Sequence, residues 1–247
     1  MLTKSQIKLI TSLKQKKFRT QHQLFVVEGI KVVEEFLNSD YELDAIFSID
    51  DRFSQYNQKL TKVDSKELAK ISGFSTPNKV LATFKIPTPI AVDWSGLVVA
   101  LDDINDPGNL GTIIRLCDWF GIENLVCSEA TVDCYNPKVV QASMGSHTRV
   151  NITYVDLKKT LSAASNCMGT FMDGDSIYEQ HLPNTGVIVL GNEANGISED
   201  VEALVKTRLS IPRFGTVKQT ESLNVANAAA IILSEFKRNL LKGKIDK

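Results

Sequence analysis

Two patterns of apolar and polar positions follow each other along the chain, and they meet at a proline-containing segment. Before it, apolar runs typical of strands (24–27, 45–49, 60–63 and 80–86) alternate with segments of helical periodicity (4–17, 32–37 and 65–71). The segment itself, Ile86-Pro-Thr-Pro-Ile-Ala-Val-Asp, has two prolines in three positions and predicts a linker. We therefore predict a small α/β domain at residues 1–86 and a linker at 87–96.

The pattern restarts after this linker. Leu97–Leu101 is a continuous apolar run, as expected for a strand that is covered on both faces. Further strands are predicted at 124–127, 149–154, 168–172, 187–190 and 208–211, with helices at 109–120, from Pro137, after Asp156, after Ser198 and at 222–241. Strands that alternate with helices predict a parallel sheet covered by helices, so we expect an α/β domain at residues 97–247.

Charge is nearly balanced over the whole chain, with 28 Lys and Arg against 29 Asp and Glu, which excludes a general polycation. Residues 1–27 differ, because they contain six Lys or Arg and no acid. A basic helix of this kind is either a solvated face or a surface that contacts phosphates, and the pattern leaves both readings open.

The four cysteines form no CxxC pair and have no histidine at metal-binding spacing. We therefore expect neither a disulfide framework nor a metal site, and a reducing, cytoplasmic location. No apolar stretch has the length of a signal-peptide core or approaches the ~18 residues of a membrane span, so we expect a soluble protein with no membrane partner.

Three polar loops follow predicted strands of the second domain. The first, Asp106-Pro-Gly-Asn-Leu-Gly-Thr-Ile-Ile-Arg115, leads into a helix that Asn109 is expected to cap. The second contains Gly191-Asn192-Glu193 after the run Val187–Leu190, and the third leads to Ser222-Leu223-Asn224 at a helix start. Each loop alone is explained by a turn or a surface polar residue, but ligands of open α/β sheets bind where such strand ends meet. The first loop is neither GxGxxG nor GxxxxGK[ST], so a nicotinamide or nucleoside-triphosphate site has no support.

Together, these segments resemble the three signature motifs of the SpoU (TrmH-type) RNA ribose 2′-O-methyltransferases, a branch of the SPOUT superfamily, over Leu97 to about Leu241. The front domain resembles the L30e-like RNA-binding domain that often precedes them, through Lys14-Gln-Lys-Lys-Phe-Arg19 and Phe25-Val-Val-Glu-Gly29. The resemblance implies a SPOUT-type parallel sheet with a C-terminal trefoil knot, and S-adenosylmethionine as the cofactor. By position, that cofactor would be held by Leu190, Gly191, Ile211, Pro212, Leu223 and Asn224.

The residues that match the polar active-site positions of the family are Asn109, Arg115, Glu193, Ser222 and Asn224. We expect Arg115 to act as a fixed cation near the reacting ribose rather than as a base, because a guanidinium stays protonated at ordinary pH. Asn109 and Glu193 are expected to position Arg115 and the ribose, while Ser222 and Asn224 shape the cofactor loop. His147 is given no role, since a lone histidine is more often structural.

The resemblance also implies a homodimer that acts on structured RNA, held in part by Lys14, Lys16, Lys17 and Arg19. Ribosomal RNA is favoured and transfer RNA is the alternative. The apolar last helix is either the dimer interface or a part of its own chain's core. Two other classes compete with this interpretation: an RNA-binding protein that has lost catalysis, which the five retained polar residues argue against, and a small-molecule methyltransferase, which would have no use for a basic front domain.

Overall fold

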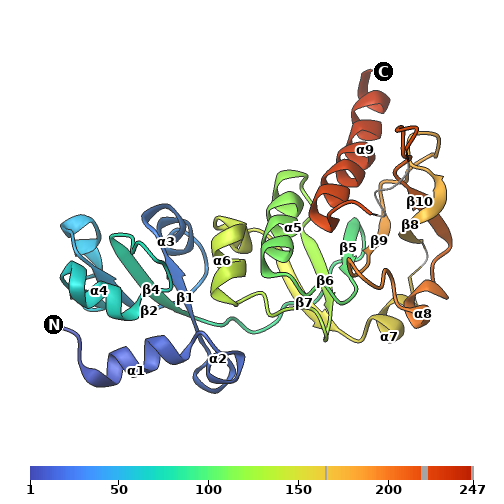
Figure 1. The fold of residues 1–247 in the computed structure, drawn as a ribbon. Coiled ribbons are helices and arrows are strands. Elements are labelled where there is room, and N and C mark those ends of the chain that lie inside the picture. The colour runs from blue at the N-terminus through green and yellow to red at the C-terminus, as the bar shows by residue number, and fades with distance from the viewer. Residues whose placement is uncertain (165, 218–221, 246–247) are drawn as a thin grey trace. The chain divides into compact units, whose positions relative to one another are not determined.

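The computed structural model describes residues 1–164, 166–217 and 222–245 (Figure 1). The chain forms two compact units. Unit 1 contains Met1–Thr88 together with Asp133–Thr148, and unit 2 contains Pro89–Val132 together with Arg149–Lys247. The first boundary falls close to the predicted linker. The inclusion of residues 133–148 in unit 1 differs from the sequence prediction, which assigned this segment to the second domain.

Unit 1 is built on a mixed sheet of order β1-β4-β2-β3, in which β4 is antiparallel to β1 and β2 while β2 and β3 are parallel. Its strands are β1 (Leu24–Glu28), β2 (Leu43–Ser48), β3 (Leu60–Lys62) and β4 (Val80–Lys85). Its helices are α1 (Lys4–Ser12), α2 (Lys16–His22), α3 (Ile30–Leu37), η1 (Asp51–Tyr56), α4 (Ser65–Ile71), α6 (Pro137–Ser143) and η2 (Ser146–Thr148).

Alternation along β1 separates two hydrophobic clusters, because successive side chains of a strand point to opposite faces. Phe25 and Val27 pack with Phe36 of α3 on one face. Leu24 and Val26 pack with Ile10 of α1 and other buried residues on the other face. The α/β character predicted for this region is therefore confirmed.

The predicted basic helix at 4–17 is wrong in its extent. Helix α1 ends at Ser12, and Gln15 adopts an extended backbone before α2 begins at Lys16. The predicted RNA contact at Arg19 is also wrong, because this side chain is only 2% exposed. Its guanidinium donates to Leu13 O at 2.8 Å and forms an ion pair with Asp133, so it is not available to a phosphate. Lys14, Lys16 and Lys17 are exposed.

His147 belongs to the core of unit 1, in agreement with a structural role. It is 2% exposed, and its ring nitrogens lie 2.7 Å from Ser143 Oγ and 2.8 Å from Cys134 O. Burial lowers the pKa of His147 to about 4. The imidazole is therefore neutral at pH 7, where it ties η2 to the start of the inserted segment.

Unit 2 is a six-stranded parallel sheet of order β10-β8-β9-β5-β6-β7, which confirms the predicted α/β fold with a parallel sheet. Its strands are β5 (Leu97–Leu101), β6 (Asn124–Ser128), β7 (Asn151–Val155), β8 (Cys167–Ser176), β9 (Gly186–Leu190) and β10 (Thr207–Ser210). Its helices are α5 (Pro107–Trp119), α7 (Leu157–Leu161), α8 (Glu199–Glu202) and α9 (Val225–Ile245).

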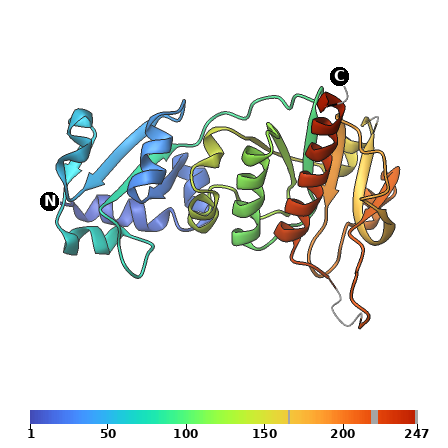
Figure 2. The ribbon, with the colours of Figure 1, turned by 90° about the horizontal axis from the view of Figure 1, so that it is seen from above.

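Helices cover both faces of this sheet. Val98 and Ala100 of β5 pack with Leu157 of α7 and Val201 of α8 on one face. Helices α5 and α9 lie side by side on the other face (Figure 2). Leu233 and Phe236 of α9 are 1% exposed within this single chain, so these apolar residues belong to its own core. The structure contains no helix long and apolar enough to cross a membrane among its described residues.

Candidate active site

The first two polar loops leave neighbouring parallel strands, β5 and β9, and are tied together by hydrogen bonds. The backbone N–H of Asp102 donates to Leu190 O at 2.9 Å. The buried carboxylate of Asp102 accepts from the backbone N–H of Ser198 at 2.8 Å. Asn192 Nδ2 donates to Asp103 O at 2.7 Å. The carboxyl ends of the two strands thus form one rigid platform.

The turn after β9 depends on two glycines. Asn192 and Gly196 exchange backbone hydrogen bonds of 2.9 Å, and Gly196 has a φ of +70°, which favours glycine. A Cβ atom on Gly191 would lie 2.3 Å from the carbonyl carbon of Gly196, so no larger residue fits there without moving the turn. The loop therefore presents bare backbone atoms at the strand end.

The third loop joins the first two through a chain of side-chain hydrogen bonds. Asn109 donates from Nδ2 to Glu193 Oε1, and its Oδ1 accepts from Asn224 Nδ2 at 2.9 Å. Asn224 also caps α9, because its Oδ1 accepts from the backbone N–H groups of Ala226 at 3.0 Å and Asn227 at 3.3 Å. Glu193, Asn109 and Asn224, one from each loop, are therefore held in a line.

The prediction that Asn109 caps the helix of the first loop is wrong. Asp106 is the N-cap of α5, and its carboxylate accepts from the backbone N–H of Asn109 at 2.8 Å. Pro107 occupies the first helical turn, where its missing N–H costs no hydrogen bond. The side chain of Asn109 is thereby left free to bridge the other two loops.

Arg115 lies on the same helix as Asn109 and is exposed. Six residues of α-helix correspond to a rise of about 9 Å, so the backbone of Arg115 belongs to a later turn of α5 than that of Asn109. Among the described residues, none pairs with the guanidinium of Arg115. A cation that is held by no internal partner is available to a bound anion.

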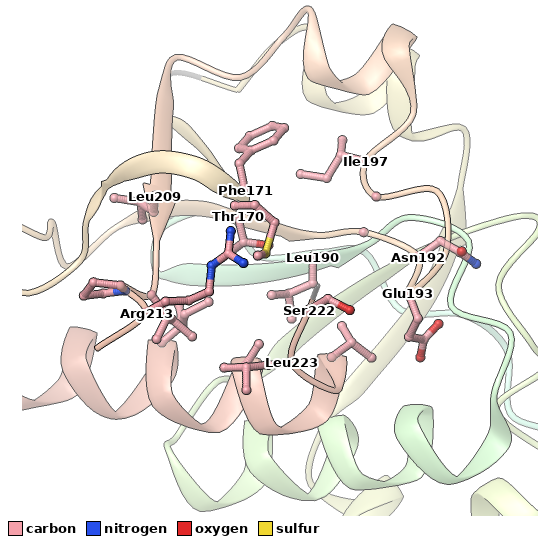
Figure 3. A pocket seen from close by; sticks show the side chains of 18 of the residues that line it. Thr170, Phe171, Leu190, Asn192, Glu193, Ile197, Leu209, Arg213, Ser222 and Leu223 are labelled. Carbon is pink, nitrogen blue, oxygen red and sulfur yellow. The ribbon is translucent and has the colours of Figure 1, made fainter. Parts of the chain in front are cut away.

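A cavity of about 720 Å³ opens beside these loops (Figure 3). Five of the six residues predicted to hold a cofactor line it: Leu190, Gly191, Ile211, Pro212 and Leu223. Glu193 and Ser222 line it as well, whereas Asn109, Arg115 and Asn224 do not. Asn224 is instead the cap that joins the cavity wall to Asn109. The cavity has the volume usual for a small-molecule site.

Strand β8 contributes a wall of the cavity that the sequence does not predict. Thr170, Phe171 and Met172 line the cavity because β8 lies between β10 and β9 in the sheet. The strand was predicted, but the order of strands is not encoded in local periodicity. Arg213 was also missed, and Figure 3 shows its guanidinium turned toward the cavity from the side opposite Glu193.

Arg208 packs against the ring of Phe171. The guanidinium carbon of Arg208 lies 3.5 Å from the centroid of the Phe171 ring. Arg208 also pairs with Asp173 at 2.7 Å and with Glu202. The hydrogen bond from Arg208 lowers the pKa of Asp173, and those with Asp173 and Glu202 raise the pKa of Arg208. This network fixes the aromatic wall of the cavity in one orientation.

Comparison with known proteins agrees with the geometry of this site. Residues 96–234 match the SpoU rRNA Methylase family. The chain belongs to this family. Residues 4–82 match the MRM3-like substrate binding domain, so the front of the chain is a substrate-binding domain of that type. The prediction of a SpoU-type protein with a front substrate-binding domain is confirmed.

Related proteins span nearly the whole chain. A 23S rRNA (guanosine(2553)-2′-O)-methyltransferase of Bacillus subtilis is 30% identical over 232 residues, which cover 88% of this chain and 90% of the relative. A structure from Porphyromonas gingivalis assigned to the TrmH family of RNA methyltransferases is 38% identical, with a TM-score of 0.89 over 96% of this chain and 99% of that one. An AdoMet-bound rRNA methyltransferase from Sinorhizobium meliloti is 27% identical, with a TM-score of 0.85 over 97% of each chain.

Proposed function

We propose that this protein transfers a methyl group from S-adenosylmethionine to a ribose 2′-oxygen of ribosomal RNA. The observation that carries the proposal is the Glu193–Asn109–Asn224 line, which joins the three loops of the family beside a cavity of small-molecule size. Similarity to enzymes named as rRNA 2′-O-methyltransferases supports the same reaction.

The cavity suits S-adenosylmethionine in volume and in the chemistry of its lining. Gly191 leaves the backbone at the end of β9 uncovered, and Leu190, Ile211 and Leu223 supply apolar walls. The carboxylate of Glu193 at the cavity edge complements a positively charged ligand. When bound, the cofactor supplies a methyl group on a sulfonium, which needs no metal to leave. Among the described residues, no group of three or more His, Cys, Asp or Glu side chains is placed to hold a metal ion.

The polar residues of the site have separate tasks in this proposal. A ribose hydroxyl is a weak nucleophile, so it must be oriented and lose its proton as it attacks the methyl carbon. Arg115, which is exposed, provides a positive charge beside the phosphodiester and stabilises the developing negative charge on the 2′-oxygen. Asn109 and Glu193 position the ribose, and Ser222 and Asn224 hold the cofactor loop.

Ribosomal RNA is the favoured substrate, and transfer RNA is the alternative. The B. subtilis relative and the mitochondrial rRNA methyltransferase 3 of Xenopus laevis, which is 30% identical over 310 residues, are both named for ribosomal RNA. Exposed Lys14, Lys16 and Lys17 of unit 1 would contact its phosphates. An L30e-like fold for the front domain and a cytoplasmic location are parts of the same proposal.

A homodimer and a trefoil knot complete the proposal. Trp119 at the end of α5 is 81% exposed, whereas Ile232, Leu233 and Phe236 of α9 are buried in their own chain, which favours an interface near the end of α5. The contact between Asn224, which follows β10, and Asn109, which follows β5, is consistent with a knotted C-terminal path. Light scattering of the wild type and of Trp119→Ser tests the dimer, since loss of the ring should weaken association.

The decisive experiment is methylation of total RNA with tritiated S-adenosylmethionine, followed by mapping of the modified ribose. We expect label in ribosomal RNA at a 2′-oxygen. Label in transfer RNA alone would support the alternative substrate. A chain that binds RNA but neither binds nor consumes the donor would be a non-catalytic RNA-binding protein, and the proposed reaction would be wrong.

A further inference from the structure

Two aromatic rings stand in solvent at the rim of the cavity. Phe214 lines the cavity from the loop that follows β10, yet its side chain is 83% exposed. Tyr178 follows β8 and is 44% exposed. The two ring centroids lie 6.4 Å apart, with an interplanar angle of 35°. The pair therefore presents adjacent aromatic surfaces beside the site of methyl transfer proposed above.

The sheet determines where these rings lie. Strands β8 and β10 pair in parallel up to Ser176 and Ser210. The pairing continues one step beyond, because the backbone N–H of Ile177 donates to Ser210 O at 2.9 Å. The residues that follow both strands thus emerge side by side. The approach of Tyr178 and Phe214 results from strand pairing rather than from two independent loops.

The surroundings of the rings match the chemistry of single-stranded RNA. Burial of a phenylalanine side chain is stabilising, and Phe214 lacks most of this stabilisation in the free protein because its side chain is exposed. Arg213, its neighbour in the chain, places a positive charge on the same wall, and Glu193 and Ser222 line the same cavity. Aromatic faces next to a cation are what proteins use to hold unstacked bases near the phosphate backbone.

We propose that Phe214 and Tyr178 form a stacking platform for an unpaired base of the substrate RNA, at the methylated nucleotide or at one of its two neighbours. This inference rests on the proposed function. A strand that inserts one ribose into the cavity gives up base stacking at that point. An aromatic platform at the rim restores this stacking, because a base can stack on an aromatic side chain as it does on another base.

The first test compares variants that keep or remove the aromatic face. Phe214→Ala and Phe214→Leu should each raise the KM for the mapped rRNA fragment roughly 10-fold, the lower-middle part of the range for one stacked base. Phe214→Trp and Tyr178→Phe, which keep a ring, should retain wild-type KM values. The Kd for S-adenosylhomocysteine, measured by calorimetry, should be unchanged in all four variants. A wild-type KM in Phe214→Leu, or a parallel loss of cofactor affinity in Phe214→Ala, would overturn the platform.

The second test combines a change in the protein with removal of one base from the RNA. The rRNA fragment is made with an abasic ribose at the methylated nucleotide or at either neighbour, so that the sugar stays while the base is removed. At one of these positions, Phe214→Ala should add no further loss of affinity, because the stacking partner is already absent. Additive losses at all three positions would contradict the inference.

Filter binding of the same fragments, with S-adenosylhomocysteine present, separates this inference from the proposed function. If the losses of affinity from Phe214→Ala and from base removal are not additive but no methyl transfer occurs, the proposed reaction is wrong and the platform stands. If methyl transfer occurs but these losses of affinity are additive, the platform is wrong and the proposed reaction stands.

Discussion

The side-chain amide of Asn224 donates to Oδ1 of Asn109 at 2.9 Å, across a separation of 115 positions in the sequence. Because Asn109 also donates to Glu193, its amide is oriented by both neighbours at once. The three loops of the site are therefore coupled through one side chain. A change at Asn109 should disturb Glu193 and the start of α9 together.

The role of this coupling can be separated from helix capping at Asn224. Asn224→Asp keeps an oxygen for the N–H groups of Ala226 and Asn227 but cannot donate to Asn109. We expect a melting temperature near that of the wild type and a clear drop in kcat. Asn224→Ala, which loses the cap as well, should cost about 1 kcal/mol of stability in addition. Equal activity in Asn224→Asp and the wild type would show that the bridge to Asn109 is not needed.

Gly191→Ala should impair cofactor binding, because its Cβ would lie 2.3 Å from the carbonyl carbon of Gly196. The turn must move to relieve this overlap, so we expect at least a 10-fold rise in the Kd for S-adenosylhomocysteine. Gly96→Ala is the matched control, since a Cβ there has no atom within 4 Å among its possible neighbours in the described structure. Calorimetric titration of both variants measures the effect, and equal affinities would contradict it.

Arg115→Ala should lower the rate of methyl transfer strongly while cofactor binding survives, because Arg115 does not line the cavity. The loss of one preorganised group that stabilises developing charge is worth about 10²–10³ in rate. Arg115→Lys, which keeps the charge, should recover part of this rate. If cofactor affinity falls together with transfer, Arg115 has been assigned to the wrong task.

Arg19 and Lys16 offer a matched comparison within α2. Arg19→Met leaves the carboxylate of Asp133, which is 14% exposed, without its ion-pair partner, and breaking this largely buried pair should cost about 3 kcal/mol, the lower end for buried pairs. Lys16→Met removes an exposed charge and should change stability by less than about 0.5 kcal/mol. Urea unfolding measures both. Lys16→Met should instead weaken RNA binding and reduce its salt dependence, while unchanged stability in Arg19→Met would contradict the burial argument.

His147 should make the stability of unit 1 depend on pH. Burial lowers its pKa from 6.5 to about 4, a difference that corresponds to about 3 kcal/mol. This stability is fully present above pH 6.5 and is lost as the pH falls toward 4, because the unfolded chain takes up the proton first. His147→Gln should flatten the pH dependence of the free energy of unfolding between pH 7 and pH 4. An unchanged slope in this variant would exclude His147 as its source.

The local pattern of apolar and polar residues was sufficient to predict the helices and strands of unit 2 and the positions of the three loops. Continuous apolar runs such as Leu97–Leu101 predicted strands that are buried on both faces, and β5 has this environment. Pro107 could also have indicated Asp106 as the helix cap, since proline is favoured in the first helical turn.

Other features depend on strand order or on distant partners, which periodicity does not encode. Phe171 lines the cavity only because β8 lies next to β10 and β9. Arg19 was assigned to the surface from the basic composition around it, whereas its partner Asp133 is 114 positions away. Composition describes the average environment of a segment, and a single buried charge departs from that average.

Residues 133–148 belong to unit 1, and this affects how RNA binding and methyl transfer can be separated experimentally. A truncated enzyme that begins after the linker would keep Tyr135 and His147 but lose Phe25 and Phe36, the rings against which they pack. If this truncated enzyme were inactive, the cause would be the exposure of core residues and not the loss of RNA contacts. Chimeras that exchange substrate recognition between relatives should therefore carry residues 133–148 along with the first 88 residues.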